Sequence, residues 1–379
     1  MKPIDGTPFG DEIAEHSQND VTQMIQKAAS VANELAKLSP ADHAKLLRTI
    51  GVHIESAREQ LVATACAETA LAEGRIGGEI TRTTVQFNRF AELVETGEHL
   101  KVVIDKANPD YSPAPRPDIR KLNQPLGVVA IFAASNFPLA FSVAGGDAAS
   151  AIAAGNAVVA KAHPSHPNTC AIIEKCVKGA LKECGISESA FSIVQGVNPQ
   201  ITHWLALDPL IQAIGFTGSE TVGRIQVDLA ASREVPIPVF AEMGSLNPLF
   251  ITSAAITERS EALANGLVDS ALMGSGQFCT KPGILIVPTG AEGDSFIAEI
   301  ESYLATIAVA PLLNKGIADR FTSAIVELAK SSSLKTFAGK ATEGGFGVTP
   351  TVFVVDWADA FKNKELLEEH FGPTTVIIR

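Results

Sequence analysis

The chain has 379 residues, 46% of them hydrophobic, which is enough for one large domain or, as the better expectation, two domains with substantial cores. Its formal net charge of -12 argues against electrostatic capture of nucleic acid or an anionic membrane and leaves small molecules as the expected partners. Five cysteines at unpaired spacings predict free thiols in a reducing compartment, which we expect to be the cytoplasm.

The first hundred residues are predicted to be helical. Acidic residues come early and no apolar segment of signal-peptide length follows, so we expect no signal peptide. Apolar and charged positions then recur at helical spacing, and residues 1–99 are predicted to be a helical lead-in to a cofactor domain. The most apolar later run, residues 127–146, is interrupted by polar residues and a proline, so no membrane span is expected.

The rest of the chain divides into three segments of different texture. In residues 100–124, two short β-type runs flank a proline-rich stretch, which predicts a projecting β-hairpin arm. Residues 125–240 repeat an apolar run, a loop and a helix-like stretch, as in a parallel sheet covered on both faces. A further α/β segment occupies residues 241–379. We therefore predict an α/β fold with a Rossmann-like parallel-sheet cofactor domain and an α/β catalytic domain.

Loops at the carboxyl ends of the predicted strands contain the first candidate site residues, because ligands of such sheets bind there. Asn136 follows the first apolar run, Lys161 ends the second and Gly196 follows the third. Loop 215–223 follows the fourth, and its small residues would let backbone N–H groups face a phosphate. The residues alone leave plainer readings open: a turn-forming asparagine, a lysine that reaches solvent, and an ordinary turn with Ser219 as a helix cap.

Cys279 and Glu242 are the strongest chemical signals. Cys279 lies in the glycine-rich stretch 274–280 and Glu242 lies on a separate segment, as thioester formation followed by hydrolysis would require. Each alone could be structural: a small buried thiol or a solvated carboxylate. His163 and His166 form an H-x-x-H pair without a third ligand at metal-site spacing, so no metal site is predicted.

Six short motifs together resemble the aldehyde dehydrogenase superfamily in order and rough spacing. They are Ser-Asn-Phe-Pro at 135–138, Gly-Asn-Ala-Val-Val-Ala-Lys at 155–161, Gly-Phe-Thr-Gly-Ser at 215–219, Glu-Met-Gly at 242–244, Gly-Gln-Phe-Cys at 276–279 and Glu-His-Phe-Gly-Pro at 369–373. The finer texture at 132–147 and 161–167 is similar to the branch of 2-oxoglutarate semialdehyde (2,5-dioxopentanoate) dehydrogenases and related NADP-dependent enzymes.

The resemblance implies a catalytic role for three residues. The Cys279 thiolate would attack the aldehyde carbonyl, and the Asn136 amide with the Cys279 backbone N–H would hold the oxyanion. Hydride would then leave for the nicotinamide. Glu242 would activate the water that hydrolyses the thioester, which favours hydrolysis over transfer to coenzyme A.

The resemblance also implies a set of cofactor contacts: Lys161 at the adenine ribose, Gly218 and Ser219 by the pyrophosphate, Glu369 on the nicotinamide ribose and Phe371 against the nicotinamide. NAD-preferring relatives often carry a glutamate three places after this lysine, where the present chain has Pro164. Without that carboxylate, Lys161 with His163 or Ser165 would engage a 2′-phosphate. The expected cofactor is therefore NADP, with NAD as the alternative.

The nature of the substrate is less specified. Binding of a carboxylate-bearing aldehyde would require a positively charged side chain. The predicted helix containing Arg82, Gln86 and Arg89 is one source, although these arginines could equally be solvated. The apolar run around Phe137 and Phe141 would also suit an aliphatic aldehyde.

The expected function is oxidation of 2-oxoglutarate semialdehyde to 2-oxoglutarate with NAD(P)+. One alternative is a broader aliphatic NADP-dependent aldehyde dehydrogenase. Another is a catalytically impaired nucleotide-binding or assembly protein. Family members continue well beyond the last motif, whereas this sequence stops at Arg379, and family members also form homo-oligomers. An unpaired sheet edge and exposed apolar surface are expected where it stops.

Overall fold

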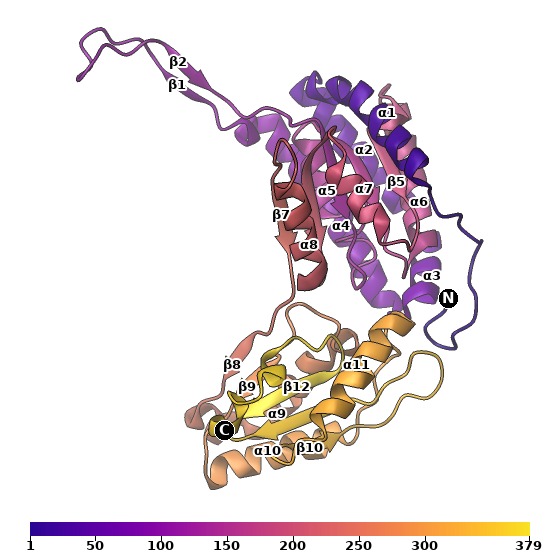
Figure 1. Cartoon of the computed structure of the whole chain (residues 1–379), viewed down its shortest axis with the longest axis vertical. Coiled ribbons are helices and arrows are strands. Elements are labelled where there is room, and N and C mark those ends of the chain that lie inside the picture. Colours follow the sequence, from indigo (N-terminus) through magenta and orange to yellow (C-terminus); the bar gives the residue numbers. More distant parts are fainter. The chain divides into compact units, whose positions relative to one another are not determined.

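The computed structural model describes residues 1–379, which form two compact units (Figure 1). The large unit comprises Asp11–Thr64 and Glu73–Met243, and the small unit comprises Met1–Gly10, Ala65–Ala72 and Gly244–Arg379. Two short stretches from the predicted helical lead-in therefore group with the small unit. None of the helices is both long and apolar enough to cross a membrane.

The large unit is built on a five-stranded sheet in which every neighbouring pair is parallel. Its order is β5-β4-β3-β6-β7, with the bounds Phe191–Val194, Ala157–Lys161, Val128–Phe132, Ile211–Thr217 and Val239–Glu242. All five residues of β3 are buried, as expected for a strand covered on both faces. The connections reverse direction between β3 and β6, and this switch point is where open α/β sheets bind ligands.

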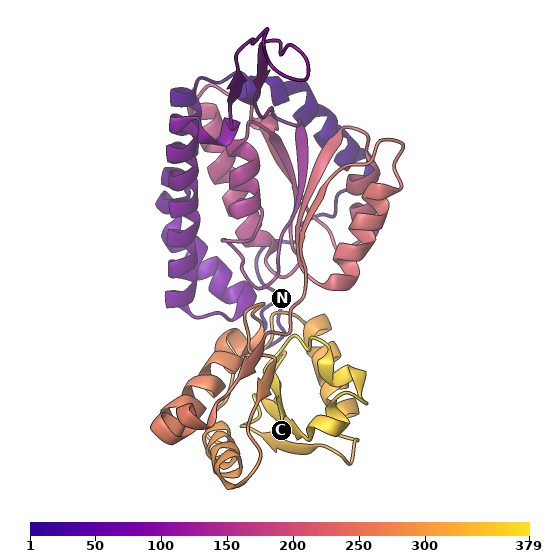
Figure 2. The same cartoon turned by 90° about the vertical axis from the view of Figure 1, so that its left-hand side faces the viewer.

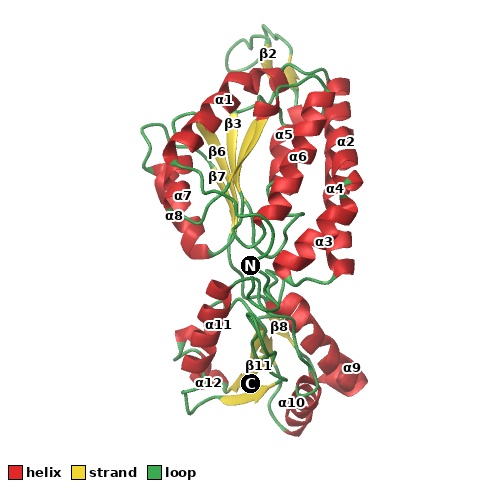
Figure 3. Cartoon of the chain, turned by 90° about the vertical axis from the view of Figure 1, so that its right-hand side faces the viewer, coloured by secondary structure: helices red, strands yellow, loops and turns green.

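Helices cover both faces of this sheet (Figures 2 and 3). One face carries α2 (Pro40–Ser56), α4 (Glu73–Thr96), α5 (Gly146–Ala153) and α6 (Pro167–Glu183). The other face carries α1 (Gln18–Ala36), α7 (Gln200–Leu207) and α8 (Glu220–Ala231). The remaining helical segments of the first 190 residues are α3 (Arg58–Thr69), η1 (Glu98–Leu100) and η2 (Glu188–Ala190).

Local sequence explains where the first two helices begin. Ser17 caps α1 and forms a capping box with Asp20, so two backbone donors that would otherwise lack partners are satisfied. Ser39 caps α2, and Pro40 occupies the first turn, where its missing N–H costs nothing.

The predicted arm is a two-stranded antiparallel hairpin that projects from the large unit (Figure 1). Strand β1 (Val103–Asp105) pairs with β2 (Ile119–Lys121), and a single bridge joins Asn108 to Arg116 nearer the tip. The apolar side chains of Val103, Ile104 and Ile119 are 49%, 56% and 46% exposed. The arm therefore presents apolar surface to its surroundings.

The small unit contains a second five-stranded sheet, ordered β10-β11-β12-β9-β8. The bounds are Lys335–Ala338, Thr351–Val355, Thr374–Ile378, Ile284–Ile286 and Pro248–Phe250, and only the β10–β11 pair is antiparallel. The accompanying helices are α9 (Ser253–Leu272), η3 (Met273–Gly276), α10 (Ala291–Leu304), α11 (Lys315–Leu328), α12 (Trp357–Ala360) and η4 (Lys364–Leu367). Leu267, Phe296 and Ile377 belong to one core cluster, and Leu328, Phe353 and Leu366 belong to another.

The last strand corrects one expectation. Strand β12 is not an unpaired edge, because it lies between β11 and β9 and all five of its residues are buried. The α/β fold class is confirmed: both units have mainly parallel sheets, and the arm is present.

Candidate active site

Asn136 lies in the loop that follows β3, and an ion pair between a partly exposed arginine and a buried glutamate holds this loop. The Asn136 carbonyl accepts a hydrogen bond of 3.3 Å from the guanidinium of Arg75 on α4. Arg75 pairs with Glu79 at 2.8 Å and lies 4.4 Å from the centre of the Phe137 ring. Two residues one turn apart on α4 therefore hold the loop of Asn136, the residue predicted to stabilise the oxyanion.

Glu79 completes this support from the interior. Its side chain is only 3% exposed, and one carboxylate oxygen accepts from the backbone N–H groups of Leu139 and Ala140 at 3.2 and 3.3 Å. Burial raises the pKa of Glu79, while the charge of Arg75 and these hydrogen bonds oppose the rise. The pair therefore fastens the whole turn from Asn136 to Ala140.

Lys161 ends β4, and its amine is drawn toward the neighbouring strand end. The amine donates to the carbonyl oxygens of Ala162 at 2.7 Å and Gly196 at 2.6 Å. Burial lowers the pKa of Lys161 to about 8. Gly196 has a φ of 144°, so this close approach uses backbone that favours glycine.

The neighbouring histidines do different things. Burial, with the charges of His166 and Lys161, holds the pKa of His163 well below its usual value, so His163 is neutral at neutral pH. Its Nδ1 accepts from the N–H of the buried Ser165 at 3.2 Å. His166 is fully buried and contacts the Ala134 carbonyl at 2.9 Å. The structure contains no cluster of three or more ligands that could hold a metal ion.

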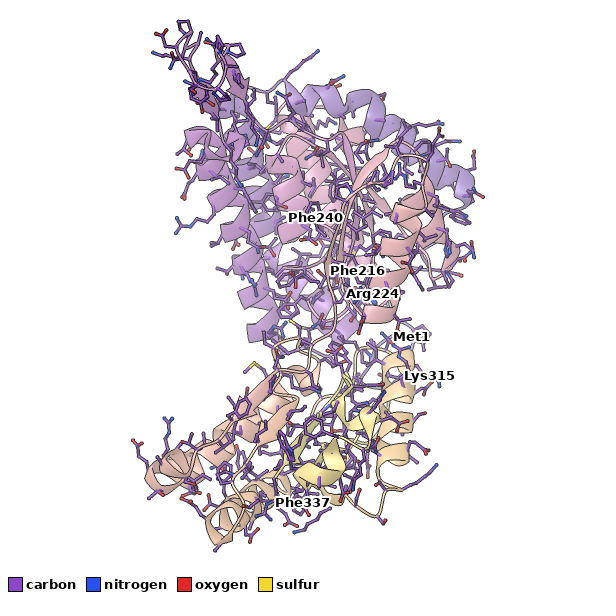
Figure 4. All side chains as sticks on the ribbon, turned by 60° about the vertical axis from the view of Figure 1, so that its left-hand side comes forward. Met1, Phe216, Arg224, Phe240, Lys315 and Phe337 are labelled. Atoms are coloured by element: carbon purple, nitrogen blue, oxygen red, sulfur yellow. The ribbon has the colours of Figure 1, made fainter.

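Gly218 and Ser219 form the turn between β6 and α8. A Cβ at Gly218 would lie 2.7 Å from the Phe216 ring, so the turn needs a residue without a side chain. The Gly218 N–H donates to the Glu242 carbonyl at 3.1 Å, so this N–H group already has a partner in the sheet. Ser219 precedes α8 without making a side-chain cap. Figure 4 labels Phe216 of β6 and Arg224 of α8.

Glu242 is the exposed last residue of β7, the edge strand of the large sheet. Its charge acts on Asp147 of α5: burial raises the pKa of Asp147 first, and repulsion from Glu242 raises it further. Phe240, two residues earlier on the same strand, is 66% exposed (Figure 4). Glu242, the predicted general base, therefore lies on a short strand that pairs with a neighbour on one side only.

In the small unit, an unusual turn precedes Cys279. Gly274, Ser275 and Gly276 are all left-handed, with φ values of 57°, 58° and 68°. A Cβ at Gly276 would collide with the carbonyl oxygen of Gly372, so only glycine lets these two segments meet. Cys279 itself is free and exposed.

A polar clamp holds the backbone of Cys279 in place. The Cys279 carbonyl accepts from the Asn247 amide at 2.6 Å and from the Ser245 hydroxyl. The same Asn247 amide reaches the Lys281 carbonyl at 3.0 Å. Asn247 has a φ of 44°, a left-handed conformation that asparagine tolerates better than most residues. The motif after Glu242 therefore also positions the cysteine.

Lys281 fastens the cysteine segment to the segment that carries Glu369. Its amine, in a side chain only 7% exposed, donates to the carbonyls of His370 at 2.8 Å and Gly372 at 2.9 Å. Burial lowers the pKa of Lys281 to about 8. Burial also raises the pKa of Glu369, whose carboxylate accepts from the Ser245 N–H.

The predicted site residues are divided between the units. The large unit contains Asn136, Lys161, His163, Ser165, Gly196, Gly218, Ser219 and Glu242, and the small unit contains Cys279, Glu369 and the half-buried Phe371. Sequence reasoning missed Arg75, Glu79, Asn247 and Lys281, which bind backbone groups of a candidate residue or of its near neighbours in the chain. The local signals available were a lysine two places after the cysteine and an asparagine directly before a proline.

The large unit has the doubly wound parallel sheet that commonly binds dinucleotides at its switch point, and the small unit carries a free cysteine after a left-handed turn. The family model described as "Aldehyde dehydrogenase family" matches residues 1–379. The chain belongs to the aldehyde dehydrogenase family.

Relatives agree with this assignment. The chain is 37% identical over 379 residues to alpha-ketoglutaric semialdehyde dehydrogenase 2 of Azospirillum brasilense, covering all of this chain and 71% of the relative. It is 36% identical to alpha-ketoglutaric semialdehyde dehydrogenase of Acinetobacter baylyi, covering 100% and 72%. The solved structure of glyceraldehyde-3-phosphate dehydrogenase from Methanocaldococcus jannaschii with NADP shares the fold, with a TM-score of 0.82, 19% identity and coverage of 100% and 80%.

Proposed function

We propose that the chain oxidises 2-oxoglutarate semialdehyde to 2-oxoglutarate through a thioester on Cys279. The Cys279 sulfur attacks the aldehyde carbon, and the Asn136 amide N–H stabilises the negative oxygen that forms. A bound nicotinamide dinucleotide supplies the hydride acceptor. The Glu242 carboxylate takes a proton from water as that water attacks the thioester, which releases the acid and restores the thiol.

The residues at the strand ends fit such a cofactor. Gly196 and Gly218 place backbone without side chains after β5 and β6, as dinucleotide sites require, and the Lys161 amine supplies a positive charge at the end of β4. Pro164 stands three places after Lys161 where a carboxylate would repel a 2′-phosphate, and His163 is neutral, so within this loop Lys161 alone supplies the positive charge. These features support a preference for NADP, with NAD also accepted.

The roles of Cys279 and Glu242 are tested by reduced-nicotinamide absorbance with 2-oxoglutarate semialdehyde and NADP or NAD. We expect Cys279→Ala to abolish turnover, and Glu242→Gln to retain one rapid turnover but slow the steady state about 100-fold or more. Cys184→Ala, which removes another free thiol, should leave the rate unchanged. Normal steady-state turnover in Cys279→Ala would overturn the proposal.

Arg82 is the observation that carries the choice of a carboxylated substrate. Its guanidinium lies 4.8 Å from the centre of the Phe141 ring and 5.9 Å from that of Phe137, and the exposed side chain forms no ion pair. Arg89, about two turns later on the same helix, already pairs with Glu92 at 2.9 Å. An arginine without a carboxylate partner, next to the Asn136 loop, suits recognition of an acidic substrate.

The substrate assignment predicts a selective defect. Arg82→Gln should raise KM for 2-oxoglutarate semialdehyde about tenfold or more and leave KM for an uncharged aliphatic aldehyde nearly unchanged, because only the first substrate loses a charged hydrogen bond. Arg89→Gln is the matched control on the same helix. Equal losses for both aldehydes would favour the broader aliphatic function.

We also propose that the arm contacts a second copy of the chain. Its exposed Val103, Ile104 and Ile119 support this, since three apolar side chains on a small hairpin have no core of their own. Ile104→Lys should lower the native mass in solution, whereas Lys106→Ala on the same arm should not. An unchanged native mass in Ile104→Lys would contradict the role of the arm.

A further inference from the structure

The segment before α1 crosses the strand ends of the large sheet. The backbone N–H of His16 donates to the Gln195 carbonyl at 3.1 Å, and the Gln195 N–H donates to His16 Nδ1 at 2.8 Å. The Glu15 carboxylate accepts from the N–H of Asn198 at 2.5 Å. Three hydrogen bonds therefore fix this segment against the loop that follows β5.

These contacts bring the Glu15 carboxylate to the group that Lys161 binds. The Gly196 carbonyl accepts from the Lys161 amine at 2.6 Å. A Cβ at Gly196 would lie 2.6 Å from Cγ of Glu15 and 2.7 Å from its Oε1. The negative charge of Glu15 favours the protonated form of Lys161, and Glu15 is exposed and in no ion pair. One negative and one positive side chain thus flank Gly196.

The sheet topology places Glu15 and Lys161 where dinucleotide folds recognise the adenine ribose. In doubly wound dinucleotide folds, an acidic residue beyond the second strand accepts the ribose 2′-hydroxyl, whereas a cation accommodates a 2′-phosphate. By sheet order, β4 is that second strand, and its end carries the cation Lys161. The carboxylate comes instead from Glu15, which is 146 positions earlier in the chain.

We propose that Glu15 is a specificity-determining residue of the cofactor site. It accepts a hydrogen bond from a 2′-hydroxyl and repels a 2′-phosphate, so it limits the NADP preference that Lys161 confers and allows use of NAD. The inference rests on the proposed cofactor site and concerns how strongly that site discriminates. It does not depend on which aldehyde is oxidised.

Glu15→Gln tests the charge alone, because the amide oxygen can still accept from the Asn198 N–H. The probes are adenosine 5′-monophosphate and adenosine 2′,5′-bisphosphate, which differ only in the 2′-phosphate, with binding measured by calorimetry. We expect Glu15→Gln to shift the ratio of the two Kd values about tenfold toward the bisphosphate at low salt. The shift should shrink in about 0.5 M salt, where charges are screened within a few ångströms.

Glu12→Gln is the matched control, since it removes the same charge from the same exposed segment. A smaller shift in Glu12→Gln than in Glu15→Gln supports the proposal, as does a parallel change in the KM ratio for NADP and NAD. An unchanged Kd ratio in Glu15→Gln, with both probes still bound, overturns this inference and leaves the proposed function intact. If neither probe nor either dinucleotide binds the unaltered protein, the cofactor site itself is wrong, and the inference falls with it.

Discussion

The Asn136 loop and the Cys279 loop are held by different chemistry. The first is held by a charge pair with a buried Glu79 and a partly exposed Arg75, and both side chains satisfy backbone groups of the loop. The second is held by neutral donors, the Asn247 amide and the Ser245 hydroxyl, on backbone that is already left-handed. Removing one member of a charge pair leaves the other charge unpaired and lowers stability. Removing a neutral donor costs less stability and mainly lets the loop that it holds move.

The largest effect should come from breaking the charge pair. Glu79→Ala leaves Arg75 without its carboxylate and two backbone N–H groups without an acceptor, so the free energy of unfolding should fall by about 3 to 5 kcal/mol. Urea denaturation measures this. The double variant Arg75→Met with Glu79→Met should recover much of the loss, because no unpaired charge stays behind; a double variant as unstable as Glu79→Ala would contradict this account.

The neutral clamp should affect rate more than stability. Asn247→Gly keeps the left-handed backbone accessible but removes the amide, so kcat should fall about 100-fold as the cysteine shifts by roughly an ångström. The rate of Cys279 alkylation by iodoacetamide reports the same change without the cofactor. Wild-type kcat and alkylation in Asn247→Gly would show that the clamp does not position the thiol.

The smallest effect concerns Lys281, which joins the segment after Cys279 to the segment that carries Glu369. Its pKa is lowered from 10.5 to about 8, so between these values the unfolded chain binds a proton that the folded chain does not. This group therefore makes stability rise with pH from about 8 upward, by about 1.4 kcal/mol per pH unit at most. Denaturation at pH 8 and 9.5 should show a flatter pH dependence in Lys281→Met than in the unaltered protein, and equal slopes would sink the assignment.

Local patterns were sufficient to predict the fold class, whereas the roles of the motif residues stay predictions. Short apolar runs predicted strands β3 to β6, because a strand covered on both faces is apolar at most of its positions. The central place of β12 could not be predicted in the same way. Its apolar run fits an edge or a centre, and only pairing with β9, almost a hundred residues earlier, decides between them.

The supporting residues escaped prediction for a related reason. Glu79 acts on a loop about 60 positions later, and Glu15 on one about 180 positions later. Neither has a motif of its own, since one carboxylate on a helix or in an exposed segment is an ordinary surface residue until the fold brings a partner. Asn247 was nearer to recognition, because an asparagine before a proline often marks a turn.

The hydrogen bond from the Gly218 N–H to the Glu242 carbonyl makes one amide proton a reporter on the base. Strand β7 has four residues and one unpaired edge, so it belongs to the part of the sheet that opens most easily. Each opening would expose the Gly218 amide to exchange with deuterium and release Glu242 from its place. Its exchange rate, read by nuclear magnetic resonance, would therefore follow how often the base is out of position.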